Sequence, residues 1–165
     1  MSKKDNEHKK ELLVTKIKNG VVIDRIPPGR SLKVLSVLGI DDEYPAMVAL
    51  AIKVPSKKRE EKLKDVLKIA EIELTEEEKN KLGLVIPGAT YNIIRDFEVY
   101  KKEELRIPQH FKGILKCQNP KCITNFREPI TPEYEVISTD PLTIRCIYCE
   151  RFMGEEYISQ QLFGR

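Results

Sequence analysis

The sequence predicts an α+β protein that folds as two domains. In the first hundred residues, apolar segments with strand-like and helix-like spacing alternate, with short turns between them. Four cysteines in two close pairs all lie beyond residue 116, where they can hold a small segment around a metal ion. The 165 residues could form one medium domain or two small ones, and the position of the cysteines favours two.

The first domain begins with a predicted β-hairpin. The dipeptide Asn19-Gly20 is typical of a two-residue turn, and apolar residues flank it on both sides (Leu12, Val14 and Ile17 before it, Val21 to Ile23 after it). We therefore expect a strand, a tight turn and a second short strand that ends at Pro27-Pro28.

A helix and a strand follow this hairpin. Residues 32–38 have the apolar spacing of an amphipathic helix, and Gly39 can end it. Residues 46–54 are apolar and rich in strand-forming side chains, and Pro55 closes this strand.

The spacing of residues 63–74 fits either a helix or a strand, and the next residues decide between them. Thr75 followed by Glu78 is a capping box, so a new helix should start there and finish near Gly83. A segment that leads directly into this cap is more easily a strand. Residues 91–99 then continue as a further strand.

This order of elements predicts the architecture of both domains. Strand, helix, strand, strand, helix, strand is the order of the ferredoxin-like plan, an antiparallel sheet with both helices on one face. The cysteine-bearing segment predicts a small metal-bound β domain of the rubredoxin or zinc-ribbon type.

The cysteine spacing predicts one structural zinc ion. Cys117 and Cys122 can form one short loop and Cys146 and Cys149 another, so that four thiolates meet in a tetrahedron. Four sulfurs leave no position for water or substrate. Two disulfides are an alternative, but the N-terminus lacks the apolar stretch of a signal peptide, and a cytoplasmic chain keeps its thiols reduced. An iron–sulfur centre also fits the spacing.

Charge and turn signals divide the chain. We expect a disordered tail over residues 1–10, a first domain over 11–106 and a metal domain over 107–165, with the boundary near Pro108. The metal domain carries seven basic and seven acidic residues, so the whole net charge of +3 lies in the first 106 residues. A zinc ribbon that binds nucleic acid is the alternative function, but it should carry a concentrated basic face. No apolar run is long enough to span a membrane.

No catalytic constellation is visible in the sequence. His8 lies in the polar tail, His110 lies at the domain boundary, and both glycine-rich phosphate loops are absent. A phosphate site would therefore have to use lysine side chains. In a strand over residues 63–74, Lys64 and Lys68 share one face, and Lys102 could reach the same edge. An anionic ligand would relieve the repulsion between these cations, although solvated surface lysines are the simpler interpretation.

Five motifs in this order resemble the family of aspartate carbamoyltransferase regulatory chains (Gly20–Pro27, Lys64–Ile69, Ala89–Ile94, Cys117-x4-Cys122 and Cys146–Glu150). The resemblance runs from about Leu12 to the end. It implies a non-catalytic, cytoplasmic subunit that controls pyrimidine biosynthesis, with an N-terminal allosteric domain that binds nucleoside triphosphates, typically CTP as inhibitor and ATP as activator.

The resemblance also implies partners. The zinc domain would dock onto the catalytic chain, with Tyr148, Glu150 and the loop Gln118–Lys121 as candidate contacts. Three regulatory homodimers would join two catalytic trimers into a dodecamer, and neither nucleic acid nor a membrane would be a partner.

The nucleotide site is implied residue by residue. Lys68 and Lys102 would meet the phosphates, and Lys64 would lie nearby. Arg25 stands where the family often has His, and Phe97 where a Tyr is often found, so both bear on nucleotide preference. Asp24 would accept a sugar hydroxyl. The remaining implied residues lie near the base and ribose or line the pocket (Val14, Lys16, Ile17, Val22, Asn92, Ile94 and Val99).

Overall fold

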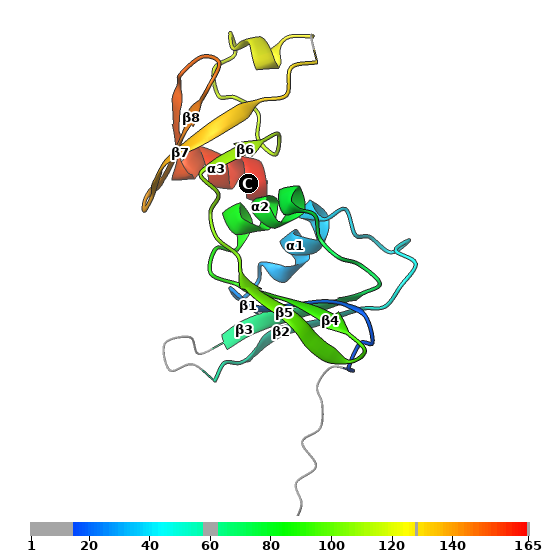
Figure 1. Ribbon diagram of the computed structural model, residues 1–165. Helices are drawn as coiled ribbons and strands as arrows, with labels where there is room; N and C mark the ends of the chain where they lie inside the picture. Colours follow the sequence, from blue (N-terminus) through cyan, green and yellow to red (C-terminus); the bar gives the residue numbers. More distant parts are fainter. Residues whose placement is uncertain (1–14, 58–62, 128, 165) are drawn as a thin grey trace, which may run out of the picture.

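Two antiparallel sheets make up the computed structural model, which describes residues 15–57, 63–127 and 129–164 (Figure 1). The first sheet lies under two helices, and the second sheet lies beyond those helices with a third helix beside it. No helix in the described part of the chain is long and apolar enough to cross a bilayer.

The first sheet, sheet A, has the strand order β2-β3-β1-β4-β5, with every neighbouring pair antiparallel. Its first four strands are joined in the β-α-β-β-α-β sequence of the predicted ferredoxin-like plan. The fold class is therefore confirmed, and one strand is added at the β4 edge. The strands are β1 (Gly20–Ile26), β2 (Val48–Pro55), β3 (Leu63–Ala70), β4 (Thr90–Arg95) and β5 (Glu98–Glu104).

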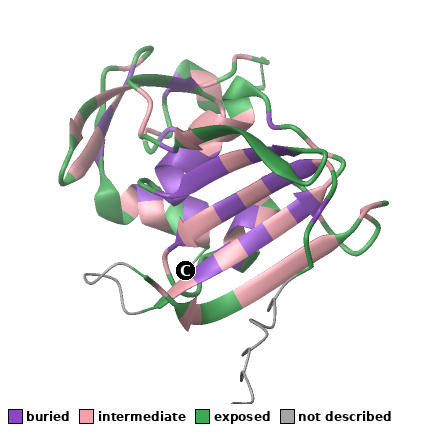
Figure 2. Ribbon diagram, turned by 60° about the horizontal axis from the view of Figure 1, so that its bottom comes forward, coloured by how far each residue is buried: buried purple, intermediate pink, exposed green. Residues whose placement is uncertain are grey.

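Helices α1 (Ser31–Val37) and α2 (Glu76–Val85) cover one face of sheet A (Figure 1). Buried and partly exposed residues alternate along the central strands, as the other face of the sheet shows in Figure 2. The alternation places one set of side chains in the core under the helices (Val21, Ile23, Leu67, Ile69, Tyr91 and Ile93, with Val34, Leu82 and Val85 from the helices).

The predicted ends of the two helices are confirmed in part. Gly39 has a φ of +67°, and the amide of Ile40 donates to the carbonyl of Leu35, so a left-handed residue ends α1 as expected. Thr75 and Glu78 form the capping box at the start of α2. The helix continues past Gly83, however, because a Cβ there would lie 2.0 Å from the carbonyl oxygen of Arg106. This glycine allows two backbones to approach closely and does not end the helix.

The hairpin predicted at Asn19-Gly20 is wrong. Gly20 begins β1, and residues 15–17 are not a strand; residues 12–14 lie outside the described part of the chain. A Cβ at Gly20 would lie 2.2 Å from the carbonyl oxygen of Ile69, so the glycine is required by contact with β3. The amide of Glu71 donates to the carbonyl of Asn19, and the amide of Asp96 donates to its side chain.

The single strand predicted over residues 91–99 is also wrong, because it is a hairpin of β4 and β5. Arg95 pairs with Glu98, so Asp96 and Phe97 form a two-residue turn, with φ values of +49° and +67°. A left-handed conformation at a bulky residue such as Phe97 costs about 1–2 kcal/mol. The amide of Phe97 donates to the carbonyl of Lys18, which ties the turn to the segment before β1.

The second sheet, sheet B, has the order β6-β7-β8-β9 and belongs to the cysteine-bearing segment. Its core contains Phe111, Tyr134, Ile144 and Met153. Ile158 and Leu162 of the third helix join this core, but the sequence reasoning did not predict that helix. The elements are β6 (His110–Lys112), the short 3-10 helix η1 (Ile123–Asn125), β7 (Glu133–Thr139), β8 (Leu142–Cys146), β9 (Phe152–Gly154) and α3 (Glu155–Phe163).

Asp65 is a fully buried carboxylate on the core face of β3. It accepts hydrogen bonds from the hydroxyl of Ser31 at 2.6 Å, from the amide of Gly29 at 3.0 Å and from the amide of Lys53 at 2.8 Å. Burial alone would raise the pKa of this carboxyl, but these bonds to the charged form outweigh burial and lower it. Asp65 thus joins β3 to the start of α1 and to β2.

Asp65→Asn should destabilise the chain by about 2–4 kcal/mol, because a buried charge-assisted network loses its acceptor. The folded-state pKa of Asp65 is depressed, so its stabilisation is complete above the unfolded-state pKa of about 3.9 and is lost as the pH falls through the folded-state value. Urea unfolding followed by circular dichroism between pH 3 and 7 measures both effects. Asp41→Asn, in an exposed turn, is the matched control and should leave stability nearly unchanged.

Candidate functional site

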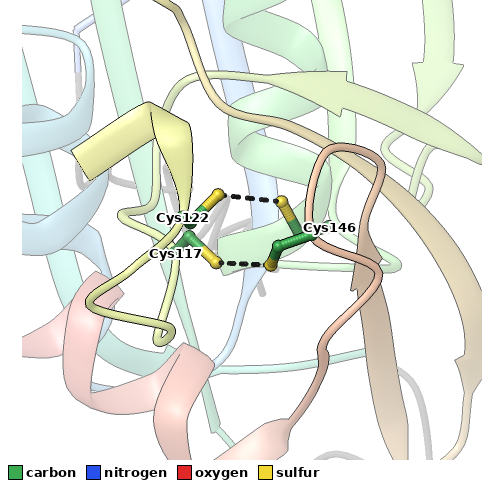
Figure 3. Close-up of side chains that lie close together, drawn as sticks. Cys117, Cys122 and Cys146 are labelled. Atoms are coloured by element: carbon green, nitrogen blue, oxygen red, sulfur yellow. Dashed lines mark hydrogen bonds between the residues drawn. The ribbon is translucent and has the colours of Figure 1, made fainter. Parts of the chain in front are cut away.

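The four cysteine sulfurs converge on one point in the second domain. All four sulfur atoms lie within 4.8 Å of one another, although they come from separate segments. Cys117 and Cys122 lie before η1, Cys146 ends β8, and Cys149 lies in the turn before β9. In Figure 3 the sulfur of Cys122 faces that of Cys146, and the dashed lines mark the two close sulfur pairs, Cys122 with Cys146 and Cys117 with Cys149.

The sulfur separations fit a bound metal and not a disulfide. The cysteines are free, with 3.5 Å between the Cys117 and Cys149 sulfurs and 3.8 Å between those of Cys122 and Cys146, whereas a disulfide needs about 2.05 Å. A tetrahedron with metal–sulfur bonds of about 2.3 Å has sulfur–sulfur edges of about 3.8 Å. The disulfide alternative is therefore wrong, and the four side chains can hold one tetrahedral ion.

Asparagine side chains shape the longer cysteine loop. The side-chain amide of Asn125 donates to the carbonyls of Cys117 and Asn119, both at 2.8 Å, and the amide of Cys122 donates to the carbonyl of Asn119 at 2.9 Å. These bonds close the loop despite its four intervening residues. On the other side of the cluster, Glu150 has a φ of +59°, and its amide donates to the carbonyl of Cys146. The hydroxyl of Thr124 also donates to the Cys122 sulfur.

Burial opposes the ionisation of two of the four thiols. It raises the pKa of Cys117 and of Cys146, since a thiolate is poorly solvated there. Burial acts in the same direction at Cys149, but the amide of Arg151 and the side chain of Asn119 outweigh it and lower the pKa to about 7. A site that includes these two buried thiols therefore needs a cation to hold Cys117 and Cys146 as thiolates.

The second group of candidate residues lies on the outer face of sheet A, opposite the helices. Strand register places Lys68 opposite Val22, Val22 opposite Asn92, and Asn92 opposite Lys102. Four neighbouring strands therefore present one row of side chains, with a lysine at each end. The side-chain amide of Asn92 donates to the carbonyl of Val22, which fixes the centre of this row.

Asp24 and Lys64 lie beside this row and form an ion pair. The Lys64 ammonium lies 2.7 Å from one carboxylate oxygen of Asp24 and 2.9 Å from the other. The amide of Arg25 donates to the same carboxylate at 2.7 Å. Arg25 itself has a φ of +58° and stands where the pairing of β1 with β3 shifts register. Asp24 is thus held in place by Lys64 and by the adjacent backbone.

Lys68 lies under the segment that precedes β1. Its ammonium group donates to the carbonyl of Thr15 at 3.1 Å. Burial first, and then the nearby charge of Lys16, lower the pKa of Lys68. An anion bound beside Lys68 would therefore also feel the positive charge of Lys16.

The other predicted residues lie around these groups. Ile94 pairs with Val99, at the Gly20 end of β1, and Phe97 lies in the adjoining turn with an exposed fraction of 57%. Ile17 is buried beside β1, and Val14 lies outside the described part of the chain. Among the described residues, the structure thus gathers the row, the ion pair and the hairpin end on or beside one sheet.

Comparisons with known proteins match both halves of the chain to one family. The model of the allosteric domain of aspartate carbamoyltransferase regulatory chains matches residues 12–106, and the model of their metal binding domain matches residues 109–159. The chain belongs to this family. It is 50% identical to the regulatory chain of Pyrococcus furiosus, over 92% of this chain and 99% of the relative. It is also 48% identical to that of Korarchaeum cryptofilum, over 94% and 99% respectively.

Membership of the regulatory-chain family makes this a non-catalytic subunit with an allosteric domain and a metal-binding domain. The gap between the two matches, after residue 106 and before residue 109, falls between the end of sheet A at Glu104 and the start of sheet B at His110. The expectation that no catalytic constellation is present thus agrees with the family.

Sequence reasoning missed two residues that support these sites. Asp65 could have been found, because it shares the inward parity of Leu67 and Ile69 in β3, where a charged side chain requires partners. Thr124 has no sequence signal beyond its place two residues after Cys122. Its hydroxyl bond to sulfur depends on the turn of η1.

Cys146→Ser should remove high-affinity metal binding and unfold sheet B while sheet A stays folded, because sheet B is anchored at the metal. Elemental analysis should find little bound metal, and amide spectra should lose the dispersed signals of residues 109–163 alone. Ser138→Ala, in the same sheet but away from the sulfurs, is the control. A mutant chain with sheet B fully folded would contradict this dependence.

Proposed function

We propose that the outer face of sheet A binds nucleoside triphosphates, CTP and ATP, and that the chain passes this signal to catalytic chains of aspartate carbamoyltransferase. The observation that carries the proposal is the row from Lys68 to Lys102, which offers two ammonium groups across an apolar and amide centre. A triphosphate needs cations, and a base and sugar need apolar and hydrogen-bonding groups nearby. The row provides both within one surface.

Each candidate group has a chemical role in this proposal. Lys68 and Lys102 meet phosphate oxygens, and Lys16 adds positive charge beside Lys68. Asn92 and the backbone beside Val22 offer donors and acceptors to a base edge. Asp24 accepts a hydrogen bond from a sugar hydroxyl while it stays ion-paired with Lys64.

The hairpin end of sheet A and Arg25 complete the proposed site. Ile94, Phe97 and Val99 offer apolar side chains to the nucleotide, as does Ile17 in the segment before β1, whereas Val14 lies outside the described residues. Arg25 places a permanent cation near the phosphates and so favours the more highly charged nucleotides.

We assign zinc to the four-sulfur site. Thiolates are soft ligands, and a closed tetrahedral set of four suits Zn²⁺ in a structural role. With every coordination position filled by Cys117, Cys122, Cys146 and Cys149, the ion holds the second domain together and does not meet substrate.

The zinc domain is the proposed docking module for the catalytic chain. Tyr148, at 44% exposed, stands with Glu150 on the turn that carries Cys149, next to the loop Gln118–Lys121. Regulatory homodimers built from the first domains would then join two catalytic trimers into a cytoplasmic dodecamer with three regulatory dimers. A nucleotide shifts such an assembly only by binding its active and inactive forms with different affinity, and couplings of about 1–3 kcal/mol are typical.

Lys68→Ala and Lys102→Ala should each weaken CTP and ATP binding about 10- to 100-fold, because each removes a charge-assisted contact to phosphate. Wild-type affinity should also fall as the pH rises through the lowered pKa of Lys68, since the neutral amine does not attract phosphate. Isothermal titration calorimetry measures both effects. Lys112→Ala, which removes an exposed lysine paired with Glu133 in sheet B, is the control. Unchanged titrations for both variants would remove this row from the site.

Zinc removal should release the catalytic chain while nucleotide binding to the first domain persists, because the two functions lie in separate sheets. Treatment of the holoenzyme with a mercurial, followed by size-exclusion chromatography and a CTP titration, checks this outcome. An assembly that survives with its metal gone would contradict docking through the zinc domain. Salt-dependent binding of a single-stranded RNA would instead support the alternative of a nucleic-acid-binding ribbon.

A further inference from the structure

Arg30 connects the three helices of the described chain. It is the N-cap residue of α1, and its guanidinium donates at 2.9 Å to the carbonyl of Val85, the last residue of α2. The guanidinium carbon also lies 4.9 Å from the centre of the Phe163 ring, at the end of α3. The cation therefore stabilises the negative end of α2 and stacks on an aromatic ring of the metal-binding domain.

The backbone around Arg30 is bound to sheet A. Asp65 accepts hydrogen bonds from the amides of Gly29 and Ser31 and from the hydroxyl of Ser31. Arg30 therefore lies between two residues that are anchored to β3. Lys64, which precedes Asp65 in β3, points to the opposite face of the sheet and pairs with Asp24 beside the proposed nucleotide row. A displacement of β3 in that region would be carried directly to Arg30.

A groove lies beside this contact, between α1 and α3. Its volume is about 700 Å³, and its walls come from α1 and α3 (Leu32, Lys33 and Ser36 on one side, Glu156, Ser159 and Gln160 on the other). The domains are thus not packed together along the length of these helices. Phe163 lines the same groove and bears the contact with Arg30, so this contact joins the two domains beside the groove.

We propose that Arg30 is a positioning residue that couples the outer face of sheet A to the metal-binding domain through Phe163. The coupling role rests on the proposed nucleotide site, whereas the interdomain contact does not. A nucleotide on sheet A holds β3 and the anchored residues 29–31, so that Arg30 holds α3 and restrains opening of the metal-binding domain. Without the guanidinium, nucleotide binding to sheet A no longer restrains opening of the metal-binding domain.

The rate of zinc release from the full-length chain to a chelator measures this coupling, since release requires the metal-binding domain to open. In the wild-type chain, saturating CTP should slow release. Arg30→Ala should release zinc about two- to fivefold faster without nucleotide, in keeping with one exposed cation–aromatic contact. It should bind CTP with unchanged affinity by calorimetry, yet CTP should no longer slow its release. A purely structural role would not remove the CTP effect.

Arg95→Ala is the matched control. This arginine also stacks on an aromatic ring, 3.9 Å from the centre of Tyr100, but both residues belong to sheet A. Its removal should leave the zinc release rate and the CTP effect unchanged. If Arg30→Ala keeps the full CTP effect, or if CTP binds the wild-type chain without slowing release, the proposed coupling is wrong.

A double-mutant cycle separates this proposal from the proposed function. The release rates of Arg30→Ala, Phe163→Leu and the double variant need no nucleotide, and a true contact makes their effects non-additive. Absence of any CTP or ATP binding contradicts the nucleotide site and the coupling role, and the cycle then decides the interdomain contact alone. Additive effects overturn the contact itself.

Discussion

The pleat of sheet A is the constraint on which the first domain depends. Side chains of a strand alternate between faces, so the residues that fill the core also determine which residues lie on the outer face. Because Ile23 and Leu67 pair in the core, Val22 and Lys68 pair on the outer surface. A slip of one residue in β3 would bury Lys68 and expose Leu67, which the core prevents. Hydrophobic packing on one face therefore fixes the spacing of cations on the other.

Much of this fold could be predicted from local signals, because those signals act within a few residues. The capping box at Thr75 needs only Glu78, and the left-handed end of α1 needs only Gly39. The two wrong predictions have different causes. Asn19-Gly20 has the composition of a hairpin turn, yet the glycine is required by the backbone of Ile69, far along the chain. The Asp96-Phe97 turn, in contrast, has no composition signal at its second position.

The two candidate sites differ in how much of each could be predicted from the sequence. Residue type and spacing were enough to predict the metal centre, because four cysteines at this spacing have few functions other than binding a metal ion. For the outer face of sheet A, the resemblance supplied residues whose common surface depends on the register of four strands. The Asp24–Lys64 pair could not be read from spacing, because it crosses from β1 to β3 near a register shift. The burial of Asp65 could be predicted from its position among the inward-facing residues of β3, but its hydrogen-bond partners could not.

The close approach of Gly83 to Arg106 limits how this protein can be recombined. Helix α2 and the segment entering the metal-binding domain touch backbone to backbone, with no room for even one methyl group. A chimera that grafts a foreign metal-binding domain with its own entry segment must therefore inherit this steric tolerance, or the graft will meet α2 at a different angle. Gly83 and the stretch around Arg106 would therefore have to be exchanged together, although they are far apart in the sequence.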